Sequence, residues 1–116
     1  MNQELLARLR QITDEERAIL AGDATVRRSL YTTRHEFVID SARLLEKGKL
    51  IEIRPHTRFV HFPRHRHNYV ELIYMCSGST THILNGAQQV VLETGDLLFL
   101  NQGVYHEILP AAQDDV

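Results

Sequence analysis

The apolar residues of this chain follow a helical period up to about residue 49 and alternate with polar residues after it. Near the N-terminus, apolar residues at helical spacing would bury one stripe of a helix: Leu5, Leu6, Leu9 and Ile12. The run Thr13-Asp14-Glu15-Glu16 predicts a capping box, in which Thr13 caps free amides and Glu16 reaches back to the cap. The helix that begins there should reach Ala21 and stop at Gly22.

A second helix signal lies further along this first part. Asp40 or Ser41 could cap a short helix that Gly48 would end. The stretch between the two helical regions is ambiguous between strand and loop; its apolar residues are Tyr31, Phe37, Val38 and Ile39. We therefore expect residues 1–49 to form a helical N-terminal extension that packs on the rest of the chain.

From Lys49 onward, short alternating runs are separated by turn residues, which is typical of strands. The predicted strands are residues 50–53, 58–62, 69–76, 80–84, 88–92, 97–100 and a last segment that carries His106 and Ile108. Asn85-Gly86 is the strongest short hairpin signal, so the strands on either side of it should pair. Many short strands with frequent turns favour a mainly β fold, either a barrel or a sandwich.

Composition and charge fit one small globular domain. The chain has 116 residues, of which 43% are hydrophobic, and its formal net charge is -2. That charge and the scattered basic residues argue against DNA binding by this chain itself. A single cysteine excludes an intramolecular disulfide and is compatible with the cytoplasm. The sequence shows no secretion signal and no apolar run that would span a membrane.

A cluster of metal-ligand residue types gives the clearest chemical signal. His65, His67 and Glu71 stand at odd positions, so in a strand they project from one face together with Tyr69. A later strand that carries His106 could complete a set of three histidines and one carboxylate. Such a set suits a divalent transition metal, and on a barrel strand it would line a pocket.

The wider spacing resembles the two-part signature of the cupin superfamily, whose fold is a small antiparallel β-barrel or jelly roll. The first part runs from His65-x-His67 through Glu71 to Gly78, and the second from Gly95 through Asn101-x-Gly103 to His106. Three positions depart from the family pattern. It has glycine where Phe59 stands, proline where Asn101 stands and asparagine where Pro110 stands.

Within that superfamily, residues 50–116 are similar to the N-terminal effector-binding domain of AraC-type transcription regulators. The similarity is carried by Glu71-Leu72-Ile73-Tyr74, Asn85-Gly86 and Gly95-Asp96-Leu97-Leu98-Phe99-Leu100, in addition to the histidines. The resemblance implies a domain that binds a small-molecule effector, such as a sugar, inside the barrel. It also implies a cytoplasmic homodimer that contacts DNA only through a C-terminal helix-turn-helix domain. That domain is absent here, so we expect this chain to be the sensor part of a longer protein.

Two questions stay open at this point. The effector-contacting residues, predicted as His65, His67, Tyr69, Glu71 and His106, could act with or without an ion. If a metal such as Zn, Ni, Mn or Fe binds, its ligands should be His65, His67, Glu71 and His106. The same four residues would serve the alternative function, a small metal-dependent cupin enzyme such as a dioxygenase or isomerase.

The remaining histidines and the arginine pairs lie outside any motif. His35, His56, His61 and His82 are expected to be surface residues or core filler. Arg27-Arg28 and Arg64 with Arg66 are expected to be solvated charges.

Overall fold

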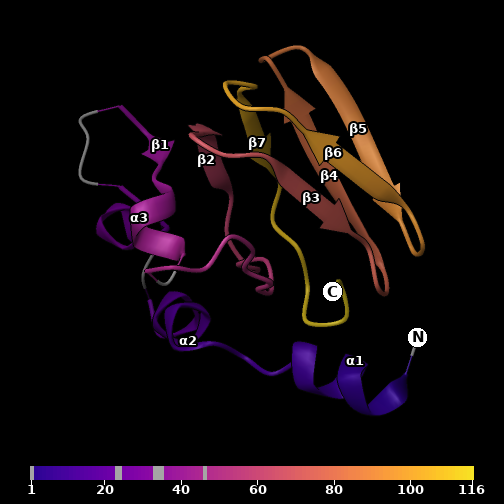
Figure 1. The fold of residues 1–116 in the computed structure, drawn as a ribbon. Coiled ribbons are helices and arrows are strands. Elements are labelled where there is room, and N and C mark those ends of the chain that lie inside the picture. The colour runs from indigo at the N-terminus through magenta and orange to yellow at the C-terminus, as the bar shows by residue number, and fades with distance from the viewer. Residues whose placement is uncertain (1, 23–24, 33–35, 46) are drawn as a thin grey trace.

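The computed structural model describes residues 2–22, 25–32, 36–45 and 47–116 (Figure 1). His35 lies outside these residues. The N-terminal helices lie at one end of the molecule, and most of the strands gather at the other (Figure 1). No helix in the described part of the chain is long and apolar enough to cross a membrane.

Two short helices open the chain, α1 (Gln3–Leu9) and α2 (Asp14–Leu20). The predicted capping box is confirmed, because Thr13 accepts from the Glu16 amide and the Glu16 side chain accepts from the Thr13 amide. Gly22 follows with a positive φ of 136°. The predicted apolar stripe from Leu5 to Ile12 was partly wrong, because α1 ends before Ile12 and Leu6 is its buried residue.

The region that the sequence left ambiguous contains a 3-10 turn, η1 (Arg28–Leu30), and a two-residue strand, β1 (Val38–Ile39). Asp40 caps the helix α3 (Ser41–Leu44) by accepting from the Ala42 amide, as predicted. This helix stops earlier than expected, because Leu45 already has an extended backbone with φ -96° and ψ 129°.

The other strands are β2 (Phe62–His67), β3 (Glu71–Tyr74), β4 (Ser79–Leu84), β5 (Gln88–Glu93), β6 (Leu97–Leu100) and β7 (His106–Ile108). They form a five-stranded sheet in the order β1-β2-β7-β4-β5 and a separate two-stranded sheet of β3 and β6. β1 pairs with β2 in parallel, and every other pair is antiparallel. The predicted short N-terminal helices are present, but the structure is mixed, with more strand than helix, and the two sheets do not close into the predicted barrel.

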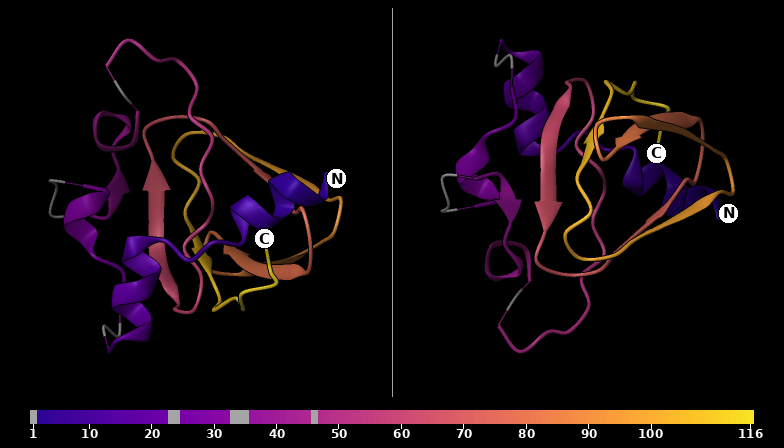
Figure 2. Two further views of the ribbon diagram at one scale, coloured as in Figure 1. Left: turned by 90° about the horizontal axis from the view of Figure 1, so that it is seen from below. Right: turned by 90° about the horizontal axis from the view of Figure 1, so that it is seen from above.

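The strand β2 stands between the N-terminal part of the chain and the remaining strands (Figure 2). β1 occupies one of its edges and β7 the other. The buried cluster around it includes residues from both sides of residue 49: Ile19, Val26, Tyr31, Ile39, Val60, Phe62 and Ile108. The helices and the large sheet therefore share one core.

The hairpin prediction is confirmed in detail. β4 pairs with β5 from Ser79 opposite Glu93 to Leu84 opposite Gln88. Asn85 and Gly86 have φ values of 51° and 77°, the left-handed region that such a turn requires.

Two predicted strands are wrong. Residues 50–53 are in neither helix nor strand, and Leu50 and Ile51 are 94% and 78% exposed. The edges of β2 are already taken by β1 and β7, so this segment has no edge of β2 to join. Residues 58–61 are not a strand either, because Phe59 has a φ of 74° that interrupts the extended backbone. Of this second predicted strand only Phe62 belongs to a strand, as the first residue of β2. Phe59 stands where the cupin pattern has glycine, the residue that adopts this conformation freely.

The predicted strand over residues 69–76 is shorter than expected. β3 has four residues, whereas β2, β4 and β5 have six each. Tyr69 precedes β3 and packs against the edge of the core instead.

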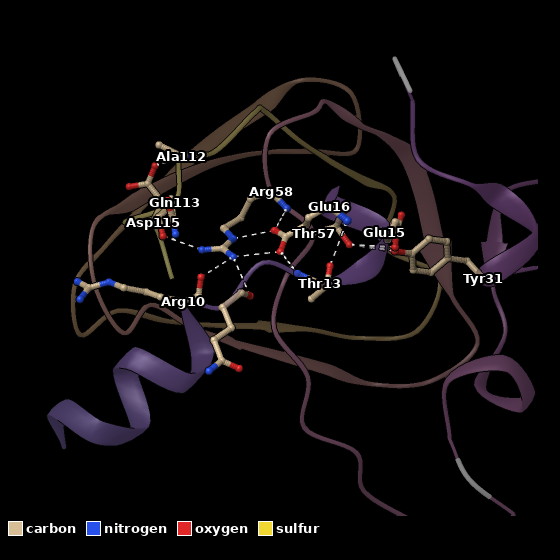
Figure 3. Close-up of polar contacts among 11 residues, drawn as sticks. Arg10, Thr13, Glu15, Glu16, Tyr31, Thr57, Arg58, Ala112, Gln113 and Asp115 are labelled. Carbon is tan, nitrogen blue, oxygen red and sulfur yellow. Dashed lines mark hydrogen bonds and ion pairs between the residues drawn. The ribbon is translucent and has the colours of Figure 1, made fainter. Parts of the chain in front are cut away.

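A buried ion pair joins α2 to the segment before β2 (Figure 3). Arg58 Nε lies 2.7 Å from Glu16 Oε2, and Arg58 Nη2 donates to Glu16 Oε1 at 3.0 Å. The side chains are 2% and 0% exposed. Arg58 also donates to the backbone carbonyls of Arg10, Gln11 and Gln113, so both ends of the chain meet on this guanidinium.

Burial by itself would raise the pKa of Glu16, but the contacts of its carboxylate outweigh burial. The hydrogen bonds from Arg58 and from the backbone amides of Thr13 and Arg58 hold the pKa below its usual value of 4.5. Glu16 therefore stays ionised at neutral pH, as the ion pair requires.

We expect Glu16→Gln to destabilise the protein strongly, because it leaves the Arg58 charge buried without its partner. Removing one partner of a buried pair costs about 3 kcal/mol or more. Urea unfolding at pH 7 measures the effect. The control is Asp14→Asn, which removes an ion pair to Arg17 whose side chains are 100% and 67% exposed. Equal unfolding midpoints for the two variants would contradict the role given to the buried pair.

Candidate functional site

The candidate site lies where β2, β7 and β3 approach one another between the two sheets. β2 contributes His65 and His67, β7 contributes His106, and β3 contributes Glu71. His65 and His106 are paired directly across the antiparallel ladder. The structure thus brings together all four residues that the sequence predicted as metal ligands. The prediction that His65, His67, Tyr69 and Glu71 share one face of one strand is wrong, because β2 ends at His67 and Glu71 begins β3 in the other sheet.

A β-bulge in β2 sets the direction of these side chains. The pairing with β7 shifts between Phe62 and His65, so one extra residue lies on the β2 side. As a result Phe62 and His65 share the interior face although one position is even and the other odd, and their rings lie 4.6 Å apart. From His65 onward the alternation is regular, and His67 also points inward.

The three histidines form a tight, buried group. Their exposed fractions are 2%, 5% and 1% for His65, His67 and His106. The ring centroids of His65 and His106 are 4.1 Å apart, and each lies 4.9 Å from the His67 ring. One nitrogen from each ring lies within 4.8 Å of the others, a spacing at which three imidazoles can hold a metal ion.

Glu71 reaches this group from the opposite sheet. Its Oε2 lies 3.0 Å from His67 Nε2 and 3.5 Å from His106 Nε2. Burial would raise the pKa of Glu71, but the close approach of His67 and the charges of His67 and His65 lower it overall. The carboxylate is therefore ionised and aimed at the histidines.

Several of these buried atoms have no hydrogen-bond partner among the described residues. They are Glu71 Oε2 and both ring nitrogens of His106. The 3.0 Å approach of His67 to Glu71 is thus a short ion-pair distance without the direction of a hydrogen bond. Buried polar atoms are normally satisfied, so these unsatisfied atoms could take up a ligand or a metal ion.

A hydrogen bond to the backbone fixes the orientation of the His65 ring. Its Nδ1 donates to the Pro63 carbonyl oxygen at 2.7 Å, which leaves the Nε2 lone pair of the neutral ring free to bind a ligand. Metal-binding histidines are commonly held in place by such a bond through the other ring nitrogen. On the chemistry of its donors, the site fits a divalent transition metal.

Tyr69 lies beside this cluster. Its ring centroid is 4.9 Å from that of His67, and the side chain is partly buried. Burial and the charge of Glu71 raise the pKa of Tyr69, so its hydroxyl remains protonated.

Two further histidines adjoin the site, and the sequence analysis assigned neither of them to it. His82 on β4 is 2% exposed and stacks on His106 at 5.9 Å with an angle of 11° between the rings. His56 packs near Phe62, and its Nε2 is fully buried although the side chain as a whole is half-buried. Side chains alternate along β4, and this alternation, counted from the hairpin turn, would have placed His82 on the inward face. His56 lies in an irregular segment and gave no signal.

Of the other expectations, the one for His61 is confirmed and the one for Arg64 and Arg66 is wrong. His61 lies at the surface as expected, where its Nε2 is 2.8 Å from Glu107 Oε2. Arg64 and Arg66 are not simply solvated, because both guanidinium groups lie over the Tyr105 ring.

Comparison with known proteins places the chain in a family. The model of the AraC-like ligand binding domain matches residues 48–116, more than half of the chain. This chain belongs to the AraC-like ligand binding domain family. All four candidate ligands of this AraC-like domain lie within the matched residues.

Other comparisons add little to that result. No curated protein matches the AraC-like chain. A solved structure, a cupin-2 domain containing protein from Shewanella frigidimarina NCIMB 400, is similar with a TM-score of 0.41 and 21% identity. The match covers 45% of this chain and 51% of that one.

Burial lowers the pKa of four histidines in or beside the site, His56, His65, His82 and His106. It lowers the pKa of His65 and of His56 to about 4, because a buried imidazolium would lose its hydration. The pKa of His106 is lowered further, by burial and by the charges of the neighbouring histidines. Burial also lowers the pKa of His82.

These shifts predict that the metal-free AraC-like domain loses stability in mild acid. Unfolded histidines bind a proton near pH 6.5, whereas the folded His65 and His56 do so near 4. The unfolded state therefore binds more protons in this window, and stability is full above about 6.5 and falls as the pH drops toward about 4. Urea midpoints in the presence of a chelator, at pH near 7.5 and near 5, measure the loss.

His65→Gln should flatten this pH dependence, because it removes one of the buried histidines whose pKa is lowered in the folded state. Equal midpoints of the unaltered protein at both pH values would contradict the assignment of buried, neutral histidines.

Proposed function

We propose that this chain is the ligand-sensing domain of an AraC-type transcription regulator. The observation that carries the proposal is the convergence of His65, His67, His106 and Glu71 on one point inside an AraC-like ligand binding domain. A small-molecule effector would bind against this group. Tyr69, beside His67, would contribute its protonated hydroxyl.

The geometry limits the directions from which an effector would approach the cluster. The three histidine rings already touch one another, at 4.1 to 4.9 Å between centroids, so no organic molecule fits between them. Glu71 is the accessible member of the group, with 30% of its side chain exposed. An effector would therefore reach the cluster from the side of Glu71, where hydroxyl groups of a sugar or a similar polar ligand would donate to its carboxylate.

Membership of the AraC-like ligand binding domain family supports a wider role. In the intact protein, we propose, the effector-bound domain controls a C-terminal helix-turn-helix domain that binds DNA in the cytoplasm. This chain has a net charge of -2 and would not bind DNA specifically alone.

We further propose that the domain works as a homodimer. The outward face of the β3–β6 sheet supports this, because its apolar residues pair across the strands and remain exposed: Leu72 (62%) with Phe99 (59%), and Tyr74 (51%) with Leu97 (62%). Apolar patches of this kind often mark protein interfaces.

A metal ion is the second part of the proposal, supported by the unsatisfied atoms of Glu71 and His106. His65, His67, His106 and Glu71 would hold a divalent ion such as Zn, Ni, Mn or Fe. When bound, the ion would supply a Lewis acid that attracts oxygen atoms of an effector. The same ligand set also favours the alternative function, a metal-dependent cupin enzyme of the dioxygenase or isomerase type.

Effector binding is tested by thermal unfolding with a panel of monosaccharides and small carboxylic acids. A ligand of this site should raise the unfolding temperature, because binding to the folded state alone stabilises it. Glu71→Gln and His67→Gln should each abolish that rise, since both remove a polar contact at the cluster. His61→Gln is the control, because this histidine is exposed. A rise that survives both cluster variants would place the ligand elsewhere.

Metal binding is tested by elemental analysis of protein that was purified without a nickel column. We expect one ion per chain, lost in His65→Ala and retained in His61→Ala. Failure to retain any of the four metals after reconstitution would leave the cluster as a hydrogen-bonded pocket. A retained metal together with turnover of a candidate substrate would favour the enzyme over the sensor.

A further inference from the structure

A second cleft lies on the outer side of β2, away from the histidine cluster. Arg64 and Arg66 alternate with His65 and His67 along this strand, so their side chains point to the opposite side. The cleft has a volume of about 260 Å³. Its lining residues come from the segment around β1, from β2 and from the loop before β7: Glu36, Phe37, Val38, Arg64, Arg66 and Tyr105.

The cleft combines positive charge with aromatic surface. The guanidinium carbons of Arg64 and Arg66 lie 4.4 and 5.5 Å from the centre of the Tyr105 ring. A third arginine, Arg28, lies 4.7 Å from the centre of the Phe37 ring. Stacking on aromatic rings holds a guanidinium group in place while its edge remains able to donate hydrogen bonds.

One carboxylate already shows what this edge can bind. Glu36 Oε2 accepts from Arg66 Nη2 at 3.1 Å, and the Glu36 side chain is 69% exposed. The adjacent Arg66 Nε is buried and has no hydrogen-bond partner among the described residues. Glu36 therefore satisfies only one of the two donors that a guanidinium group offers side by side to a carboxylate.

We propose that this cleft is a binding site for a small molecule that joins a carboxylate to a flat apolar body. The ligand carboxylate displaces the exposed Glu36 and binds both Arg66 donors. Its flat part lies against Phe37, Val38 and Tyr105, and Arg64 adds a second positive charge. Because Glu36 is held by a single exposed ion pair, its displacement costs little.

The site is separate from the histidine cluster but shares structure with it. The Phe37 ring that lines the cleft also lies 5.6 Å from the His65 ring on the other side. The Phe37 carbonyl accepts from the Arg66 amide at 3.2 Å. A ligand in the cleft would thus hold the segment around β1 against the strand that carries the candidate metal ligands.

Direct binding can be measured by fluorescence anisotropy with indole-3-acetate, because the chain contains no tryptophan and the probe alone emits as indole. Indole-3-acetamide has the same ring without the charge and is the matched control. We expect saturable binding of the acetate and much weaker binding of the amide.

Three variants in the cleft and one control variant on α1 assign that binding to the cleft. Arg66→Gln should weaken it about tenfold or more, because charged hydrogen bonds to the carboxylate are lost. Glu36→Gln should strengthen it about two- to fivefold, because the competing carboxylate is removed. Arg8→Gln makes the same charge change on α1 and should leave it unaltered. Arg66→Lys keeps the charge without the forked donors and should weaken binding even if Arg66→Gln fails to fold.

Three results would overturn the proposal: no saturable binding, equal binding of the acetate and the amide, or weaker binding in Glu36→Gln. Loss of binding in Glu71→Gln, with Arg66→Gln unaffected, would overturn it as well and move the molecule to the histidine cluster. Retained binding in Glu71→Gln is expected, and it does not depend on the sensor function proposed above.

Discussion

The buried ion pair between Glu16 and Arg58 is the interaction on which the arrangement of this domain depends. A guanidinium group without water needs nearly all of its donors satisfied, and here they are met by the Glu16 carboxylate and by carbonyls near both ends of the chain. These segments must stay together for the charge to remain buried. The pair also ties α2 to the residues just before β2, the strand that carries two of the site histidines.

Local signals in the sequence were sufficient to predict much of the fold and the shared face of the site residues His65 and His67. The capping box at Thr13, the Asp40 cap and the turn at Asn85-Gly86 each depend on a few neighbouring residues, and all three are present. The shared face of His65 and His67 depends only on strand alternation, which the bulge leaves intact from His65 onward. The cupin-like spacing then joined His106 to them across the sheet.

What the sequence could not provide was the pairing between distant segments. Residue Arg58 looked like the start of a strand, but its partner lies 42 positions earlier in the chain. Residues 50–53 alternate as a strand does, yet no strand of the described chain pairs with them. His82 joined the site through the register of β4 against β7, where it stands opposite Ile108. Alternation along β4 places His82 on the inward face, but the pairing of whole strands decides which residues it meets there, and that pairing leaves no local pattern.

The bulge between Phe62 and His65 has a consequence for how this domain can change over time. One face of β2 after the bulge carries imidazole groups into the interior, and the other carries the guanidinium groups of Arg64 and Arg66 outward. Because side chains alternate with a period of two, β2 cannot lose the bulge and keep its length, since a regular ladder from Phe62 would turn His65 and His67 outward and bring Arg66 into the core. Deletion of one residue between Phe62 and His65 would instead remove the bulge and leave the histidines inward, because their partners on β7 are also two positions apart. The bulge and the number of residues in this short segment can therefore change only together.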